Sequence, residues 1–193
     1  MLDLGTGDGR AVLARARQDP TALVIGLDAS VDAMAESSIR AARSVRKGGI
    51  PNALFVAAAV EQPPPELCGL ADEVTIHAPW GSLLRGALAV EGGEPAAAGI
   101  ASVLGPHGVA RVIVSVTERD HLALPPDALE AAALGERWSR HGLALTSIGP
   151  ADVNRVLATG SSWARRLGIG RQREAFALEL RRIAPRSSDP GSG

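Results

Sequence analysis

Residues 3–10 read DLGTGDGR, in which the apolar end of a short strand runs into three glycines that alternate with small or polar residues. Glycines at this spacing let the backbone turn sharply and approach a ligand more closely than side chains would permit. A dinucleotide-binding turn would have its third glycine where Arg10 stands, which argues against a pyrophosphate held at the following helix. The turn instead fits S-adenosylmethionine, which carries no phosphate.

A second predicted strand ends in an acidic residue about twenty residues after this turn. Residues 23–28 read LVIGLD, and the Asp28 carboxylate is placed to accept hydrogen bonds from both hydroxyls of a ribose. Taken alone, a glycine-rich turn is often an ordinary loop, and an aspartate at a strand end is often a helix cap. The two together favour a cofactor that contains adenosine.

The rest of the chain alternates predicted strands and helices, which is typical of a doubly wound, Rossmann-like α/β fold. The expected sheet has seven strands and is mostly parallel, and its last strand alternates apolar and polar residues as an antiparallel edge strand would. One domain over residues 1–186 precedes a disordered tail over 187–193. Strands are predicted at 2–4, 23–27, 54–59, 73–77, 108–116, 143–148 and 175–182, and helices at 10–18, 30–46, 95–104 and 126–141.

Composition indicates a globular, intracellular protein. The chain has 193 residues, enough for one domain with a sizeable core, and 46% of them are hydrophobic. Its single cysteine, Cys68, has no partner for an internal disulfide and is expected to be a buried thiol. The longest apolar run, residues 53–60, is too short to span a bilayer, and no secretory leader opens the sequence. We therefore expect a cytoplasmic protein with no membrane partner.

The net charge of −1 hides an uneven distribution of charge. Residues 155–186 contain eight arginines and only two acidic residues. A second basic cluster closes the helix predicted after Asp28, where cations also complement the helix dipole. Two such clusters together favour a polyanionic partner. The second cluster consists of Arg40, Arg43, Arg46 and Lys47.

Three tryptophans stand out in a chain with no tyrosine and two phenylalanines. Trp80 follows the predicted fourth strand, at the edge where a doubly wound sheet forms its ligand crevice, and Trp163 lies in the arginine-rich segment. A partly buried anchor is the alternative role for each, and Trp138 is expected to be a core residue. Two indoles beside a methyl donor and an arginine cluster favour a sharper hypothesis, in which a flipped base stacks between them while arginines hold its phosphates.

Five stretches of the sequence carry a resemblance to a known family: DLGTGDGR (3–10), IGLD (25–28), RKGGIPN (46–52), APWGSLLRG (78–86) and SSWARRLGIGRQREAF (161–176). Together they resemble the aminoglycoside-resistance 16S rRNA methyltransferases of the Kam/Npm type, which modify N1 of adenine 1408 in the decoding site. Many methyltransferases share the first motif, whereas PWGSLL followed by SSWARRLGIGR is specific to this group. The resemblance implies a class I methyltransferase fold, S-adenosylmethionine as cofactor with S-adenosylhomocysteine as product, and the 30S ribosomal subunit as substrate.

The resemblance also implies a role for individual residues. Trp80 and Trp163 would stack on the flipped adenine and position it for catalysis. Insertions at about 40–52 and 150–173 would bind RNA. The cofactor would be bound by Asp3, Gly5, Gly7, Asp28, Val60, Glu61, His77, Ser82 and Ser161. Arg165, Arg166, Arg171 and Arg173 would grip the rRNA backbone, and Arg40, Arg43, Arg46 and Lys47 would dock on the rRNA surface.

The sequence departs from the family pattern in a few places. Val60 stands where alanine is usual, and His77 and Ala78 replace larger apolar residues. Met1 lies only two residues before Asp3, so the family's N-terminal hairpin is expected to be missing. These departures concern the fit of the adenine pocket and part of the RNA-docking surface.

The expected chemistry needs no acid or base. N1 of adenine carries an in-plane lone pair that is already free at neutral pH, so catalysis would rest on proximity and orientation. Indole faces would also tolerate the cationic product, through a cation–π attraction of roughly 0.5–2 kcal/mol. The four histidines lack metal-ligand spacing, so no metal is expected.

Two alternatives remain open at this point. One is a small-molecule methyltransferase whose tryptophans line a metabolite pocket. The other is a ribosome-binding relative that keeps the cofactor fold but has weak or no activity. In each case we expect a monomer.

Overall fold

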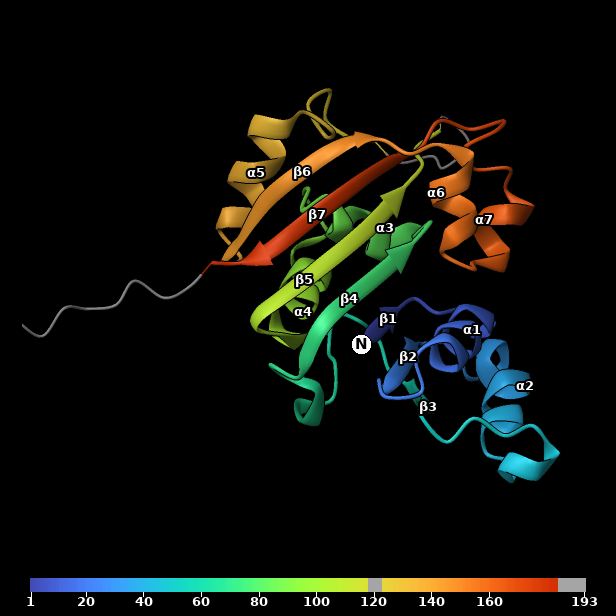
Figure 1. Cartoon of the computed structure of the whole chain (residues 1–193). Coiled ribbons are helices and arrows are strands. Elements are labelled where there is room, and N and C mark those ends of the chain that lie inside the picture. The colour runs from blue at the N-terminus through green and yellow to red at the C-terminus, as the bar shows by residue number, and fades with distance from the viewer. Residues whose placement is uncertain (118–122, 184–193) are drawn as a thin grey trace, which may run out of the picture.

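The computed structural model describes residues 1–117 and 123–183, and within them seven strands form one sheet (Figure 1). The strands are β1 (Leu2–Leu4), β2 (Val24–Asp28), β3 (Ala53–Ala57), β4 (Ala71–His77), β5 (Leu104–Val114), β6 (Leu143–Pro150) and β7 (Phe176–Arg182). Their spatial order is β3-β2-β1-β4-β5-β7-β6. The pairs β5–β7 and β6–β7 are antiparallel and the others are parallel, which confirms the predicted mostly parallel sheet with an antiparallel last strand.

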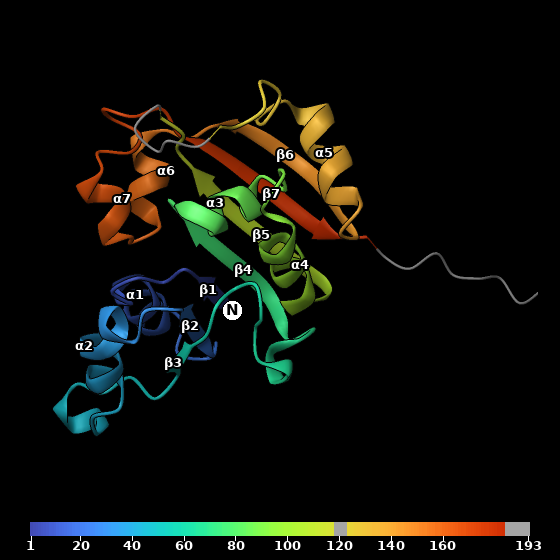
Figure 2. The same cartoon turned by 180° about the vertical axis from the view of Figure 1, so that it is seen from behind.

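Helices pack on both faces of this sheet, as a doubly wound fold requires (Figure 2). They are α1 (Arg10–Gln18), α2 (Val31–Ala41), α3 (Gly81–Ala87), α4 (Glu94–Val103), α5 (Ala131–Ser139), α6 (Val153–Ala158) and α7 (Ser162–Arg166), with short 3-10 helices at Val45–Lys47 and Pro65–Leu67. Helices α3, α4 and α5 cover the main core on one face, whereas α1 and the pair α6–α7 pack against two smaller apolar clusters.

Alternation along the central strands separates this core from a polar face. Leu2 and Leu4 of β1 enter the main core, so Asp3 between them points to the opposite face. On β4 the same period buries Val74 and Ile76 in the core. It turns Thr75 and His77 to the side of Asp3, where a functional site can form.

Trp138 is a core residue, as predicted. Its side chain is fully buried in the main core, and its indole Nε1–H donates to the Ala87 carbonyl oxygen at 3.3 Å. The bond satisfies the one polar atom that an indole carries into an apolar interior. This tryptophan therefore joins α5 to α3.

The prediction of an edge strand at 175–182 is wrong in one respect. β7 is antiparallel, but it lies between β5 and β6, so β6 forms the edge. Leu178 and Leu180 enter the core, while Glu179 lies on the opposite face with its carboxylate 3.5 Å from Arg111 Nε. Alternation therefore reports a polar face of the sheet, which an inner strand can have as readily as an edge strand.

The helix predicted over 30–46 is shorter than expected. Its cap is Ser30, as predicted, but α2 ends at Ala41 because the chain folds back on itself. The Ile50 N–H donates to the Ala41 carbonyl oxygen at 3.0 Å, and Gly49 packs so closely on the Arg43 carbonyl that a side chain would not fit. The basic cluster thus lies partly on α2 and partly on the turn after it.

The structure corrects two further predictions and does not describe the residues of a third. The helix predicted over 126–141 begins only at Ala131, because the residues before it form turns, such as the bond from Ala128 N–H to the Pro125 carbonyl oxygen at 3.0 Å. Cys68 is exposed, so the expectation of a buried thiol is wrong. The predicted tail at 187–193 lies outside the described residues.

No helix in residues 1–117 or 123–183 has the length and apolar character needed to cross a membrane.

Candidate active site

The glycine-rich turn after β1 is held at the carboxyl end of the sheet by hydrogen bonds to β2. Gly5 N–H donates to the Leu27 carbonyl oxygen at 2.8 Å, and Gly7 N–H donates to Asp28 Oδ2 at 2.8 Å. Gly7 has a φ of +56°, a conformation that glycine adopts without strain, and no atom lies within 4 Å of where its Cβ would be. The turn therefore leaves open space beside the Asp28 carboxylate, where the sequence predicts a cofactor.

Asp28 joins this turn to the start of α2. Its Oδ1 accepts a hydrogen bond from Ser30 N–H at 2.8 Å, and the Ser30 hydroxyl accepts one from Ala33 N–H at 3.3 Å, which caps the helix. Each carboxylate oxygen has further lone pairs beyond the bond that it accepts in the protein. The position thus allows Asp28 to accept hydrogen bonds from a ligand as well.

Asp3 lies in a buried polar cluster beneath the turn. The Thr75 hydroxyl donates to Asp3 Oδ1 at 2.7 Å, and His77 Nδ1 lies 3.4 Å from the same oxygen. Burial raises the pKa of Asp3, but the His77 imidazole and the Thr75 and Thr6 hydroxyls lower it more, so the pKa lies below its usual value. Asp3 is therefore a carboxylate at neutral pH, although it is only 3% exposed.

Replacing Thr75 with valine is expected to destabilise the fold by about 1–3 kcal/mol at neutral pH, because the buried Asp3 carboxylate loses its hydroxyl donor. Since the pKa of Asp3 is depressed in the folded state, its stabilisation is present above the unfolded-state pKa and is lost as pH falls through the folded-state pKa. The cost should therefore shrink toward acid pH. Urea unfolding from neutral to acid pH measures it, with Thr75→Ser as the variant that keeps the hydroxyl. An equal cost at every pH would contradict a role for the Asp3 charge.

The segment after β3 runs beside the end of β2. Ala58 N–H donates to the Asp28 carbonyl oxygen at 3.1 Å. Gly99 of α4 packs so closely on the Val60 carbonyl that any side chain there would collide with it. Val60 is buried and Glu61 is half-buried. The Val60 backbone is thus fixed against α4, a few residues after the contact of Ala58 with Asp28.

Trp80 follows a strained turn between β4 and α3. Ala78 has a φ of +53°, which costs free energy in a residue with a Cβ, and its N–H donates to the Ile113 carbonyl oxygen at 2.8 Å. The Trp80 side chain is 75% exposed, so it lies outside the core as predicted. Ser82, in the first turn of α3, is also exposed.

Trp163 is held by the short helix α7. The Ser161 hydroxyl accepts a hydrogen bond from Ala164 N–H at 3.2 Å and so caps this helix. The Trp163 side chain is 42% exposed, and the Arg166 guanidinium lies 5.7 Å from the centre of its ring. The contact is a cation–π pair on a surface open to solvent.

One small apolar cluster joins the two segments that carry these tryptophans. Ala78, two residues before Trp80, and Ala164, next to Trp163, are both buried in it with Ile113 of β5. Helices α6 and α7 accordingly lie beside the carboxyl ends of β4 and β5 (Figure 1). The fold therefore brings both tryptophan-bearing segments to the edge of the sheet where the glycine turn lies.

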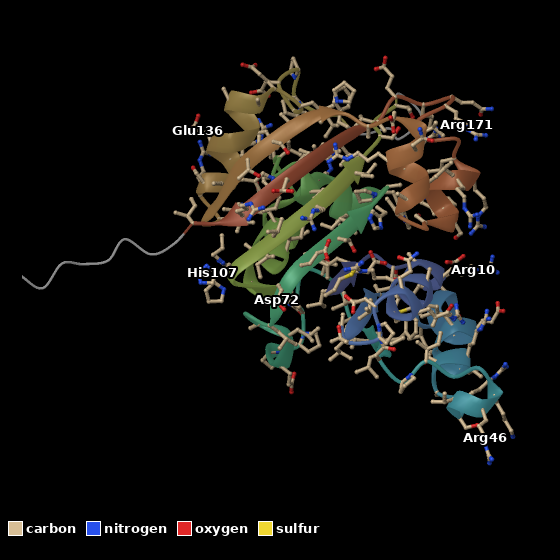
Figure 3. The ribbon with its side chains drawn as sticks, in the orientation of Figure 1. Arg10, Arg46, Asp72, His107, Glu136 and Arg171 are labelled. Atoms are coloured by element: carbon tan, nitrogen blue, oxygen red, sulfur yellow. The ribbon has the colours of Figure 1, made fainter. Side chains whose placement is uncertain are left out.

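Most of the residues predicted to bind RNA are exposed. Arg46, Arg10 and Arg171 lie along the same side of the molecule (Figure 3). Arg173 is half-buried, and the other predicted RNA-binding residues are exposed: Arg40, Arg43, Arg46, Lys47, Arg165, Arg166 and Arg171. In the described ranges, no three His, Cys, Asp or Glu side chains are grouped as a metal site would need.

Comparison with known proteins decides the family. The family model described as NpmA: 16S rRNA (adenine(1408)-N(1))-methyltransferase matches residues 1–182. The chain belongs to this methyltransferase family. The resemblance seen in the five sequence motifs is thereby confirmed.

Curated and solved members of the 16S rRNA (adenine(1408)-N(1))-methyltransferase family are similar over most of their length. The enzyme of Streptoalloteichus hindustanus is 36% identical over 182 residues, which cover 90% of this chain and 82% of the relative. The Escherichia coli enzyme is 29% identical over 186 residues, covering 92% and 84%. A mutant of the Catenulisporales acidiphilia enzyme, solved with the cosubstrate SAM, superposes with a TM-score of 0.83 at 32% identity, covering 98% of this chain and 87% of that one.

Some residues that shape this site in the methyltransferase escaped prediction from the sequence. Thr75 stands two residues before His77 on one strand, so period-two alternation carried a signal for it. Asp8 and Ser162 are hydrogen-bonded although they are 154 residues apart, and no local pattern marks such a pair.

Proposed function

We propose that this chain transfers a methyl group from S-adenosylmethionine to N1 of adenine 1408 in the 16S rRNA of the 30S subunit. One observation carries the proposal: Ala78 and Ala164 share an apolar cluster, so the Trp80 and Trp163 segments lie together, and Ser162, next to Trp163, bonds Asp8 of the glycine turn. Parallel strands bind ligands outside their carboxyl ends, so a cofactor and a stacked base would meet there. Membership of the family, whose model carries this activity in its description, supports the same conclusion.

The residues around the turn fit S-adenosylmethionine. Gly7 leaves open space beside the Asp28 carboxylate, and each Asp28 oxygen has a lone pair beyond the one hydrogen bond that it accepts in the protein. Asp28 would hold the ribose hydroxyls, and when bound the cofactor supplies an electrophilic methyl group on its sulfonium. Asp3, Gly5, Gly7, Val60, Glu61, His77, Ser82 and Ser161 complete the proposed cofactor site.

The chain's own contribution to the reaction is positioning. Adenine N1 is a nucleophile at neutral pH, so no side chain has to remove a proton. Trp80 and Trp163 would stack on the flipped base and hold N1 toward the methyl donor, with a gain of about 1–3 kcal/mol for each stacked face. This gain, with the arginine contacts, offsets a flipping cost of a few kcal/mol. The electron-rich indole faces would also stabilise the cationic 1-methyladenine product.

The exposed arginines would recognise the subunit through its phosphates and shape. Side chains cannot read the deep major groove of an RNA helix, so shape and backbone contacts dominate. Acting on ribosomal subunits would place the chain in the cytoplasm, and we propose that it acts as a monomer. Cells that express it are expected to gain resistance to aminoglycosides.

Methyl transfer from labelled S-adenosylmethionine to purified 30S subunits tests the proposal, with primer extension to locate the modified base. The expected result is incorporation and a stop at adenine 1408. Subunits with guanine at this position serve as the control and should give no stop. A stop elsewhere would overturn the target. Subunit binding without incorporation would indicate a relative that lacks turnover, and cofactor binding without subunit binding would favour a small-molecule substrate.

Replacing Arg171 with glutamate is expected to weaken 30S binding about tenfold and to lower the salt slope by about one unit, because one phosphate contact is lost. Arg140→Glu is the matched control, since Arg140 is an exposed arginine at the C-terminal end of α5, where its Nη2 lies 2.7 Å from Glu136 Oε1. Filter binding over a range of salt concentrations measures both. Equal effects of the two changes would remove Arg171 from the RNA-facing set.

A further inference from the structure

Asp8, in the middle of the glycine-rich turn, contacts elements far apart in the sequence. The Ser162 hydroxyl donates to Asp8 Oδ2 at 2.5 Å, and Arg166 Nη2 lies 3.8 Å from the same oxygen. On the other side, Arg10 N–H donates to Asp8 Oδ1 at 3.2 Å. One carboxylate therefore joins the turn to the helix that carries Trp163.

The backbone of Asp8 is fixed as well as its side chain. The Ser37 hydroxyl of α2 donates to the Asp8 carbonyl oxygen at 2.5 Å, and Ser37 is buried. Gly9 packs against the Phe55 ring so closely that a side chain would not fit. Asp8 is thus held from behind by α2 and β3, and its carboxylate points toward α7.

Helix α7 has few means of its own to stay in place. It has five residues, and a helix this short is unstable without tertiary contacts. Ala164 anchors one side of it in the small apolar cluster. Just before the helix, Gly160 packs close to α1, where a Cβ added to this glycine would lie 3.7 Å from the Ala11 Cα. Two polar contacts join α7 to the cofactor turn: the bond from Ser162, the residue next to Trp163, and the longer ion pair of Arg166 with the same Asp8 carboxylate.

We propose that the Asp8–Ser162 hydrogen bond couples the cofactor turn to Trp163, so that a cofactor bound at the turn orders the helix that stacks on the target base. The inference rests on the proposed function and adds two positioning residues to it. Neither residue needs to touch the adenine, since both act through the placement of α7. Coupling of this kind is reciprocal, so a bound base would tighten cofactor binding by the same factor.

Ser162→Ala removes the hydroxyl donor with little change in volume, and Ser162→Thr keeps it. Hydrogen–deuterium exchange with S-adenosylhomocysteine as the probe measures the tie without any turnover. In the unmodified protein the ligand should slow exchange in both the turn and α7. In Ser162→Ala the ligand should still slow exchange in the turn, but the factor by which it slows exchange in α7 should fall about tenfold. Ser162→Thr should restore that factor in α7. Ser139→Ala is the matched control, because Ser139 is an exposed serine on α5 whose hydroxyl bonds only within its own helix, to the Glu136 carbonyl oxygen at 2.7 Å.

The second measurement is the kinetics of 30S methylation. Ser162→Ala should lower kcat/KM for the subunit about tenfold while the Kd for S-adenosylhomocysteine changes less than about twofold. If S-adenosylhomocysteine no longer slows exchange in the turn of Ser162→Ala, Ser162 only supports the cofactor site. If the ligand slows exchange in α7 of Ser162→Ala as much as in the unmodified protein, the hydrogen bond does not couple the two elements. Either result overturns the coupling.

Failure of the coupling and failure of the proposed function give different results. If the unmodified protein binds S-adenosylhomocysteine but leaves 30S subunits unmethylated, the proposed reaction falls and the exchange data still decide the coupling. If it does not bind S-adenosylhomocysteine, the cofactor site and the coupling fall together.

Discussion

Replacing Trp163 with alanine is expected to lower the rate of 30S methylation by about 100-fold, because one of the two stacking faces for the flipped adenine is removed. The side chain is 42% exposed, so its loss leaves no large cavity and the fold should remain intact. The cation–π contact with Arg166 disappears with it. The Kd for S-adenosylhomocysteine should change little, since the glycine turn and Asp28 are untouched.

Single-turnover methylation and calorimetry with S-adenosylhomocysteine measure the two effects separately. Trp163→Phe keeps an aromatic plane and should recover most of the rate. Trp138→Phe is no substitute for this control, because Trp138 is a buried core residue. A loss of cofactor affinity as large as the loss of rate would refute the stacking role of Trp163.

Replacing Asp28 with alanine is expected to weaken S-adenosylhomocysteine binding by about 100-fold, because the ribose would lose hydrogen bonds to a charged acceptor. The same change leaves Gly7 N–H and Ser30 N–H without their carboxylate partner, so the turn also loses its link to α2. Both the lost ribose hydrogen bonds and the weakened turn lower the affinity for the cofactor. Binding of the 30S subunit in the absence of cofactor should change much less.

Asp32→Ala is the matched control for this change. Asp32 is an exposed carboxylate in the first turn of α2, close to Asp28 in the chain, and its loss should cost only about 0.3–1 kcal/mol through the helix dipole. Calorimetric titration of both variants gives the comparison. If Asp28→Ala binds as tightly as Asp32→Ala, Asp28 is a cap for the turn and not a cofactor ligand.

Elements that depend on neighbouring residues were predicted well from the sequence. Helix α1 has the predicted bounds, because a strand end, a glycine turn and a helix start follow one another within a few residues. The cap at Ser30 is correct for the same reason. The end of α2 was missed because it depends on Ile50, which folds back to bond Ala41.

In the candidate site, too, features set by neighbouring residues were predicted and features set by distant residues were not. Asp28 and the glycines are predicted from their spacing, and Trp80 from its place after a strand, and these roles stay predictions. Thr75, which bonds the buried Asp3, was not predicted, because only its alternation with His77 along β4 indicates which face of the sheet it shares. The position of β7 inside the sheet was also missed, since the strand's alternation describes its faces and not its neighbours.

The sequence by itself determined the class of fold and predicted the edge of the sheet at which the candidate site lies, because both follow from patterns within a short stretch of chain. Only the tertiary structure decided that Ala78 and Ala164 share one cluster and that Asp8 bonds Ser162. The physical reason is the range of the interactions. Propensity and periodicity act between near neighbours, whereas contacts between distant segments are set by the packing of the whole sheet with its helices.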